Sequence, residues 1–269
     1  LLLLGLLPFH AFLATVGTNV IAGPMHAPLT VFALWKEAVL GVILIVAAIE
    51  IIQKRSMVNG QWSIDVIDWL ILAMIAVSIS LTAQTHADWR LYLIGFKYDF
   101  IPLVAFLILR RVSWSDQFLN QVLKVILIAA GIVAVYGIIG MYLSQQFFSW
   151  LGYSDLHSLY QPDAPLAAFQ QIGGSGIRRI QSTMSGPNQL GLWLLIPLSI
   201  VLARKKVIGH WSLVIGVFVL FAMFLTLSRS ALLAAAVIVA VVLWKQLPRK
   251  KFFQFVGVLF SLSFIFSIV

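Results

Sequence analysis

The stretch from Arg178 to Ser230 contains two short polar signatures separated by apolar residues. It opens with RRIQSTMSGPN at residues 178–188 and closes with TLSRS at residues 226–230. Between these signatures lie two apolar runs that are joined by one cationic connector at residues 204–206. If both runs cross a membrane, the chain returns to the side on which it started. Both polar signatures are therefore expected on the same side of a membrane.

The composition predicts a membrane protein built from helices. Of the 269 residues, 61% are hydrophobic and only 10% are charged, and the mean hydropathy is +1.02. Apolar runs of about 20 residues recur, which is the length that a helix needs to cross a hydrocarbon core of about 30 Å. The runs are apolar on every face, whereas strands of a transmembrane barrel alternate, so helices are expected. The chain has no cysteine, which excludes disulfides and thiol catalysis.

We expect a single transmembrane domain over residues 1–269, an all-α, polytopic helical bundle with about nine spans. The chain begins with Leu1 rather than methionine and ends in an apolar run without a polar flank, so we expect a fragment that is truncated at its C-terminus. The expected spans lie at residues 1–17, 34–52, 64–83, 94–110, 122–143, 187–203, 211–227, 230–246 and 252–269.

Lysine and arginine residues in the connectors predict the orientation, because short cytoplasmic connectors are enriched in them. Twelve of the 18 cations fall in one set of connectors, which is therefore expected to be cytoplasmic. The remaining cations, which are expected outside, are Lys36, Arg90, Lys97, Arg178, Arg179 and Arg229. Membrane topology and anionic lipids explain the net charge of +9. The sequence contains no basic stripe interleaved with aromatic residues, so nucleic-acid binding is not expected.

The one long connector, residues 144–186, is expected to be an extracytoplasmic loop. It mixes aromatic residues with the turn formers proline and glycine. Loops longer than about 15 residues without secondary structure are usually functional or disordered, and the apolar composition here argues against disorder. Its first part is expected to lie along the membrane interface, where Trp and Tyr are favoured.

Arg229 is the most informative of the outer cations. As one helix, the run from Trp211 to Trp244 would be about 50 Å long, which exceeds the bilayer, so a break is expected at Ser228-Arg229-Ser230. A helix that starts there offers free backbone amides, which together with a guanidinium make a site for a phosphate-like anion. The alternative is that Arg229 only extends to the interface and fixes a tight turn.

Arg178 and Arg179 precede another expected helix start, at Gly186-Pro187-Asn188. Proline is tolerated in a first helical turn because its missing N–H would be unpaired there. Two interpretations of the paired arginines stay open. They bind lipid headgroups, or they line a polar cavity together with Asn188.

Lys36 and Lys97 lie inside the ends of apolar runs, where a charge is costly and usually faces a cavity or a partner. Adjacent residues diverge by about 100° on a helix, so Lys36 and Glu37 are expected to have separate partners. No His-Glu-x-x-His motif, serine-hydrolase elbow or phosphate-binding glycine loop is present in the sequence, so we expect neither a metal nor a cofactor.

The two polar signatures together resemble the O-antigen ligase and polymerase superfamily. The residues that carry this resemblance are Arg179-x-x-Ser182-Thr183-x-x-x-Pro187-Asn188-x-x-Gly191 and Leu225-Thr226-Leu227-Ser228-Arg229-Ser230. The resemblance covers most of residues 90–245, and Ser230 stands where the family usually has glycine. It implies a GT-C-like membrane fold in the bacterial plasma membrane. It also implies transfer of a glycan from an undecaprenyl diphosphate carrier to a lipid, protein, polymer or growing glycan acceptor, without a metal or nucleotide sugar.

The resemblance also implies roles for individual residues. Arg229 and Arg179 would hold the diphosphate, and the catalytic base would be a histidine in an outer loop downstream of residue 269. Within the chain, His157 is the fallback for that base. The full set of candidate substrate-binding residues is Arg229, Arg179, Arg178, Asn188, Lys97 and Lys36.

Two other classes of function fit a chain with many apolar helices. A secondary transporter would require two halves with related hydropathy and charges along a mid-membrane path. The sequence shows no such symmetry, and its informative cations cluster near one face. A purely structural membrane subunit is the third interpretation.

Overall fold

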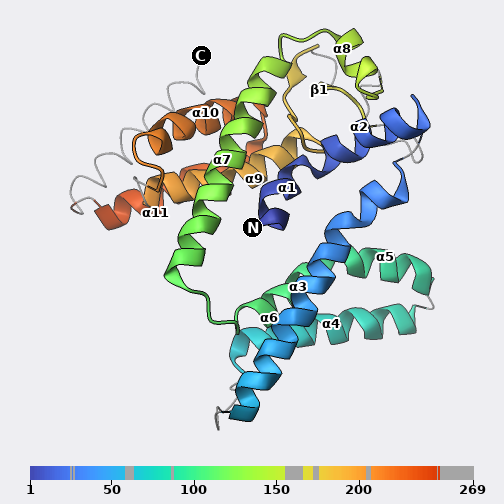
Figure 1. Ribbon diagram of the computed structural model, residues 1–269, viewed down its shortest axis with the longest axis vertical. Coiled ribbons are helices and arrows are strands. Elements are labelled where there is room, and N and C mark those ends of the chain that lie inside the picture. The colour runs from blue at the N-terminus through green and yellow to red at the C-terminus, as the bar shows by residue number, and fades with distance from the viewer. Residues whose placement is uncertain are drawn as a thin grey trace. The chain divides into compact units, whose positions relative to one another are not determined.

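The computed structural model describes residues 1–24, 26, 28–57, 64–85, 88–154, 166–171, 176–203, 207–246 and 248. Over these residues the chain is mostly helical, with one short pair of strands (Figure 1). It divides into two compact units. Unit 1 comprises Leu1–Lys36 and Asp116–Val269, and unit 2 comprises Glu37–Ser115. The prediction of a single transmembrane domain over residues 1–269 stays a prediction.

Unit 1 contains most of the helices and the two strands. Its N-terminal part comprises α1 (Leu2–Leu6), the 3-10 helix η1 (Leu7–Phe9), α2 (His10–Ala22) and the start of α3 (Thr30–Met57). The remainder comprises α7 (Asp116–Gly140), α8 (Gln145–Trp150), β1 (Gln170–Gln171), β2 (Arg178–Arg179), α9 (Pro187–Ala203), α10 (Trp211–Leu225) and α11 (Arg229–Gln246).

The core of unit 1 lies where α7, α9 and α10 pack together, and α11 packs on α9 (Figure 1). Val133 of α7, Leu190 and Leu194 of α9, and Val219 and Met223 of α10 are fully buried. A second cluster of buried residues gathers aromatic rings around α8, among them Phe148 and Phe169. Burial of these apolar side chains therefore holds α7, α9 and α10 together.

Unit 2 contains the remainder of α3 and the helices α4 (Val66–Gln84), α5 (Trp89–Asp99) and α6 (Ile101–Leu109). A capping box of Asp65 and Asp68 starts α4, because each side chain accepts a hydrogen bond from the backbone N–H of the other residue. Helices α5 and α6 meet at an angle of 44°. Pro102 lies in the first turn of α6, where its missing N–H costs little, so it fits the start of a new helix after the bend.

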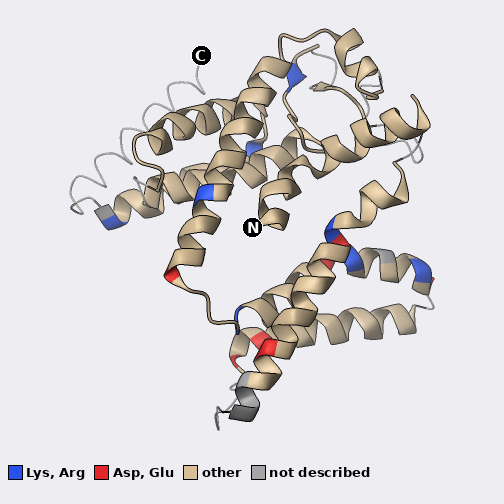
Figure 2. Ribbon diagram, in the orientation of Figure 1, with Lys and Arg blue, Asp and Glu red and all other residues tan. Residues whose placement is uncertain are grey.

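Four helical segments among the described residues are long and apolar enough to cross a membrane. They are Leu2–Ala22, Thr30–Gln53, Val66–Gln84 and Asp116–Gly140, and the bent pair of α5 and α6 makes a fifth if it is counted as one span. Helices α9 and α10 are also apolar but have only 17 and 15 residues. Helices α6 and α10 carry no charged side chain (Figure 2).

The exposed apolar side chains support the membrane assignment. On α4, Trp69, Leu70, Met74 and Val77 all have more than half of their surface exposed. Soluble proteins rarely leave such a continuous apolar face uncovered, whereas in a membrane the lipid covers it. The structure therefore supports the coarse prediction of a helical membrane protein.

The expected spans up to residue 246 fall on helices or on a bent pair of helices, and the last, 252–269, lies outside the described residues. The break expected in the run from Trp211 to Trp244 is confirmed, since α10 ends at Leu225 and α11 begins at Arg229. The count of about nine spans and the GT-C-like arrangement stay predictions.

Candidate functional site

A short antiparallel pair of strands carries the two neighbouring arginines. Gln170 of β1 pairs with Arg179 of β2, and Gln171 pairs with Arg178. Successive side chains on a strand point to opposite faces, so the two arginines are expected to point to opposite sides of this pair. Both strands lie within the predicted outer loop, residues 144–186, of which the structure describes residues 144–154, 166–171 and 176–186.

The segment from Ile180 to Thr183 holds the second strand in the core of unit 1. Ile180 is almost fully buried, and the next three side chains donate hydrogen bonds to backbone carbonyls of three different segments. The acceptors of Gln181, Ser182 and Thr183 are the carbonyl oxygens of Ala167, Val133 and Pro8, at 2.6, 2.6 and 2.7 Å. Buried polar groups are usually paired in this way. The hydrogen bonds of Ser182 and Thr183 therefore hold in place the backbone that follows Arg179.

The guanidinium of Arg179 links the strand to two helix ends. Its Nε donates to the carbonyl oxygen of Thr226 and its Nη2 donates to Oδ1 of Asn188, both at 2.8 Å. The backbone N–H of Ile180 also donates to the carbonyl oxygen of Leu225, at 3.2 Å. Arg179, Asn188 and the turn before Arg229 therefore form one hydrogen-bonded group, although 47 residues separate Arg179 from Thr226.

The turn between α10 and α11 is closed by its own side chains. Thr226 is fully buried, and its hydroxyl donates to the carbonyl oxygen of Met223 at 2.6 Å and accepts from the backbone N–H of Ser228 at 3.3 Å. Leu227 has a φ of 50°, in the left-handed region that bulky residues rarely adopt. The hydroxyls of Ser228 and Ser230 lie 3.3 Å from each other.

Arg229 is the first residue of α11, and its side chain is exposed. Among the residues that the structure describes, Arg229 makes no hydrogen bond or ion pair. Its guanidinium is therefore available to a ligand, in contrast to that of Arg179, which already donates two hydrogen bonds.

The first turns of α9 and α11 touch at Gly191. A Cβ atom added to this glycine would lie 2.7 Å from Cβ of Ala231 and 3.3 Å from Cβ of Ser228, so a larger residue does not fit without movement. The two helices consequently bring their N-terminal ends side by side. Each N-terminus has unpaired amides and the positive end of a helix dipole.

This arrangement brings the held guanidinium of Arg179 to the turn from which Arg229 starts α11. Two helix N-termini, the held guanidinium of Arg179 and the exposed guanidinium of Arg229 together favour an anion with several oxygen atoms. Partial burial lowers the pKa of Arg179. Arginine is not deprotonated in proteins near neutral pH, so the group stays charged.

Two other predicted site residues have different partners in the structure. The guanidinium of Arg178 lies 4.5 Å from the centre of the Phe169 ring, a cation–π contact rather than a bond to Asn188 or Thr226. Lys97 belongs to unit 2, where its Nζ lies 2.8 Å from Oε1 of Glu37. Glu37 thus has at least one partner besides any contact with its sequence neighbour Lys36, and the separate partners expected for these two residues stay a prediction.

The catalytic base stays a prediction. His157, the fallback for that role, lies outside the described residues. Across the described part of the chain, no group of three or more His, Asp or Glu side chains is arranged to hold a metal ion. The Nδ1 atom of His10 accepts a hydrogen bond from the indole of Trp35 at 3.1 Å.

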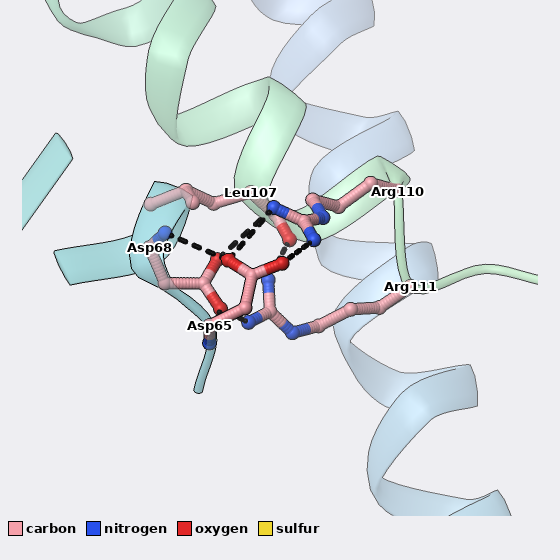
Figure 3. Close-up of polar contacts among 5 residues, drawn as sticks. All are labelled: Asp65, Asp68, Leu107, Arg110 and Arg111. Atoms are coloured by element: carbon pink, nitrogen blue, oxygen red, sulfur yellow. Dashed lines mark hydrogen bonds and ion pairs between the residues drawn. The ribbon is translucent and has the colours of Figure 1, made fainter. Parts of the chain in front are cut away.

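Sequence reasoning missed several polar residues that the structure brings together. Thr226 was not among the candidate site residues, although its carbonyl oxygen accepts from Arg179. Only its position in the turn before Arg229 could have indicated this role. In unit 2, Asp65 and Asp68 at the start of α4 form ion pairs with Arg110 and Arg111 at the end of α6 (Figure 3). The members of each pair are more than 40 residues apart in the sequence, so only the tertiary structure brings the start of α4 to the end of α6.

No protein-family model, curated protein or solved structure matches this chain.

Proposed function

We propose that this chain transfers a glycan from undecaprenyl diphosphate to an acceptor at the outer face of a bacterial plasma membrane. The observation that supports the proposal best is the convergence of Arg179, Asn188 and two helix N-termini beside the exposed Arg229. The acceptor is a lipid, a protein or a growing glycan. The chain would then be an O-antigen ligase-like transferase with about nine spans and a GT-C-like arrangement.

The proposed chemistry uses the arginine site to stabilise the leaving group. As the bond between the sugar and the diphosphate breaks, negative charge grows on the departing oxygen. Fixed guanidinium groups and helix amides at a partly dehydrated membrane edge stabilise this charge without a metal. Arg179 suits the role because Asn188 and the carbonyl of Thr226 hold its plane, so little side-chain entropy is lost when the diphosphate binds.

The acceptor hydroxyl needs a base, and the resemblance to the O-antigen ligase superfamily implies a histidine in that role. The proposal therefore gives the described residues the donor half of the site. Arg178 would help to attract the anionic donor, and Lys36 and Lys97 stay candidate substrate-binding residues.

A transfer assay with the full-length protein tests the proposal. Purified protein in detergent is supplied with a lipid-linked glycan and an acceptor, and the product is quantified. Arg229→Ala should lower transfer about 100-fold or more, as expected when a fixed donor to a developing oxyanion is removed. Arg179→Lys should recover little activity, because lysine cannot make the two directed contacts of the guanidinium.

Arg90→Ala, which removes an exposed cation from α5 in unit 2, is the matched control and should transfer normally. Equal membrane levels of all variants, measured by immunoblot, exclude failed insertion. Normal transfer by Arg229→Ala would contradict the diphosphate role. A wild-type protein that moves glycans only across sealed vesicles, and never transfers them in detergent, would instead indicate a transporter.

A further inference from the structure

The two faces of the strand pair β1–β2 carry different sets of side chains. In an antiparallel pair, directly opposite residues point to the same face and their sequence neighbours point to the other face. Gln170 is opposite Arg179, and Gln171 is opposite Arg178. The contact of Arg178 with the ring of Phe169 agrees with this pattern, because residues 169 and 171 lie on the same side of the strand. The side chains of Gln170 and Arg179 therefore share the other face.

Both side chains on this shared face reach the start of α9. Arg179 donates to Asn188 in the first turn of the helix. Gly186 precedes that turn, and a Cβ atom added to it would lie 2.8 Å from Nε2 of Gln170 and 2.7 Å from Oε1 of Gln189. Two carboxamide groups thus occupy the space beside Gly186 that a side chain would otherwise fill.

The carboxamide of Gln170 is an unpaired group in a mostly buried position. Gln170 is 4% exposed, and its side chain makes no hydrogen bond to any residue that the structure describes. Within that part of the chain, the unpaired side-chain atoms with almost no accessible surface include Oε1 of Gln181 but no atom of Gln170. Buried carboxamides are normally paired, so that of Gln170 is available to a ligand that reaches it from the start of α9.

The chemistry of these groups indicates which ligand they suit. A carboxamide is neutral and offers both donors and an acceptor, whereas phosphate oxygens only accept and are bound best by guanidinium groups. A hydroxyl both donates and accepts, so a sugar that carries several hydroxyls matches a pair of carboxamides. In the proposed reaction the sugar is bonded to the diphosphate, which places it next to the arginines. Gln170 and Gln189 lie beside that position, at the helix start that holds Asn188.

We propose that Gln170 and Gln189 form the subsite for the sugar that is bonded to the diphosphate, and that their carboxamides hydrogen-bond its hydroxyl groups. This inference rests on the proposed transfer reaction and adds the residues that select the donor sugar. Arg179 and Arg229 bind the charge that all such donors share, whereas the two glutamines distinguish one sugar from another.

Binding of lipid diphosphates with and without a sugar tests the proposal on the purified full-length protein in detergent. The probes are geranyl diphosphate and the same molecule bonded to glucose, galactose, N-acetylglucosamine or N-acetylgalactosamine. Isothermal titration measures each dissociation constant. For the wild type, at least one sugar should lower the dissociation constant about 10-fold relative to geranyl diphosphate, as expected for one or two additional hydrogen bonds.

Gln170→Leu and Gln189→Leu should remove most of this preference, because leucine has a similar volume but no hydrogen-bonding group. Both variants should bind geranyl diphosphate as the wild type does, since the arginines are unchanged. Gln171→Leu is the matched control and should keep the preference, because it changes the neighbouring glutamine on the opposite face of β1.

Gly186→Ala tests the same subsite without removing a carboxamide. The new methyl group meets only the ends of two flexible side chains, so the carboxamides should move while the helix start stays in place. The preference for a sugar should fall, and binding of geranyl diphosphate should not. This variant replaces Gln170→Leu if the latter does not fold.

The outcomes separate this inference from the proposed function. A wild-type protein that binds geranyl diphosphate but none of the sugar-bearing probes more tightly would overturn the sugar subsite alone. An equal loss of preference in Gln171→Leu and Gln170→Leu would overturn its assignment to these residues. A wild-type protein that binds none of the probes would instead contradict the diphosphate site on which the inference rests.

Discussion

The position of the Arg179 side chain is set by its hydrogen-bond partners. Its guanidinium is fixed by a backbone carbonyl and by Asn188, and the polar side chains that follow it bond to three separate backbone segments. Arg229, by contrast, is exposed at a helix start. Arg179 is held at the turn that directly precedes Arg229, so in the proposed site the held cation would position an anion while the exposed one adjusts to it.

Asp65 provides a pH test at the same scale. Its hydrogen bonds with the Arg110 guanidinium hold the pKa of its carboxyl below the ordinary value of about 4. A carboxyl with a lowered folded-state pKa stabilises the fold fully above its unfolded-state pKa, and the contribution is lost as the pH falls through the folded-state pKa. The melting temperature in detergent should therefore drop below about pH 4.

The variant Asp65→Asn is the control for this pH test, because asparagine still caps the helix but does not titrate. Its melting temperature should be lower near neutral pH and should fall less on acidification. An identical acid-induced drop in wild type and variant would show that other carboxyls cause it.

At the scale of elements, the candidate site depends on how closely α9 and α11 approach. Their N-terminal turns touch because residue 191 has no side chain, and the turn after α10 places Ser228 against the same glycine. The break between α10 and α11 thus does more than reverse the chain. It brings the start of α11 next to the start of α9 and to Arg179.

Gly191→Ala should therefore lower the free energy of unfolding, by about 1–3 kcal/mol, because the new methyl group overpacks the contact with Ala231. The second substitution Ala231→Gly should restore part of the loss, since it removes the closest atom. Gly41→Ala is the matched control, because the space beside Gly41 in α3 is open. Unfolding in mixed micelles measures all four proteins, and equal losses for Gly191→Ala and Gly41→Ala would contradict the packing argument.

At the scale of the whole molecule, the exposed apolar faces indicate that lipid covers much of the surface. On α8 the ring of Trp150 is 73% exposed, whereas Phe148 two residues earlier is buried among aromatic rings. An exposed Trp beside a buried aromatic cluster fits a position at the membrane interface. The predicted topology puts this helix outside and residues 204–206 in the cytoplasm.

Cysteine labelling tests this topology, because the native chain contains no cysteine. An impermeant maleimide should label Trp150→Cys in intact cells, and it should label Lys206→Cys only after permeabilisation. Val219→Cys, at a fully buried position of α10, should stay unlabelled in both conditions. Labelling of residue 206 but not residue 150 in intact cells would invert the topology.

The amino-acid sequence by itself determined that the chain is helical and apolar enough for a membrane, and that the long run after Trp211 must break near Arg229. These conclusions depend on length, periodicity and polarity, which are local properties. The pairing of Arg179 with Asn188 is also near in sequence, so the motif pointed to it.

Only the tertiary structure decided which distant groups meet. The carbonyl of Thr226 receives Arg179, Gly191 admits Ala231, and the carboxylates that start α4 meet the arginines that end α6. Such contacts depend on the direction in which helices cross and on small differences in side-chain volume. Many arrangements of the same apolar helices bury similar area, so hydropathy does not choose among them, whereas close packing and the pairing of buried polar groups do.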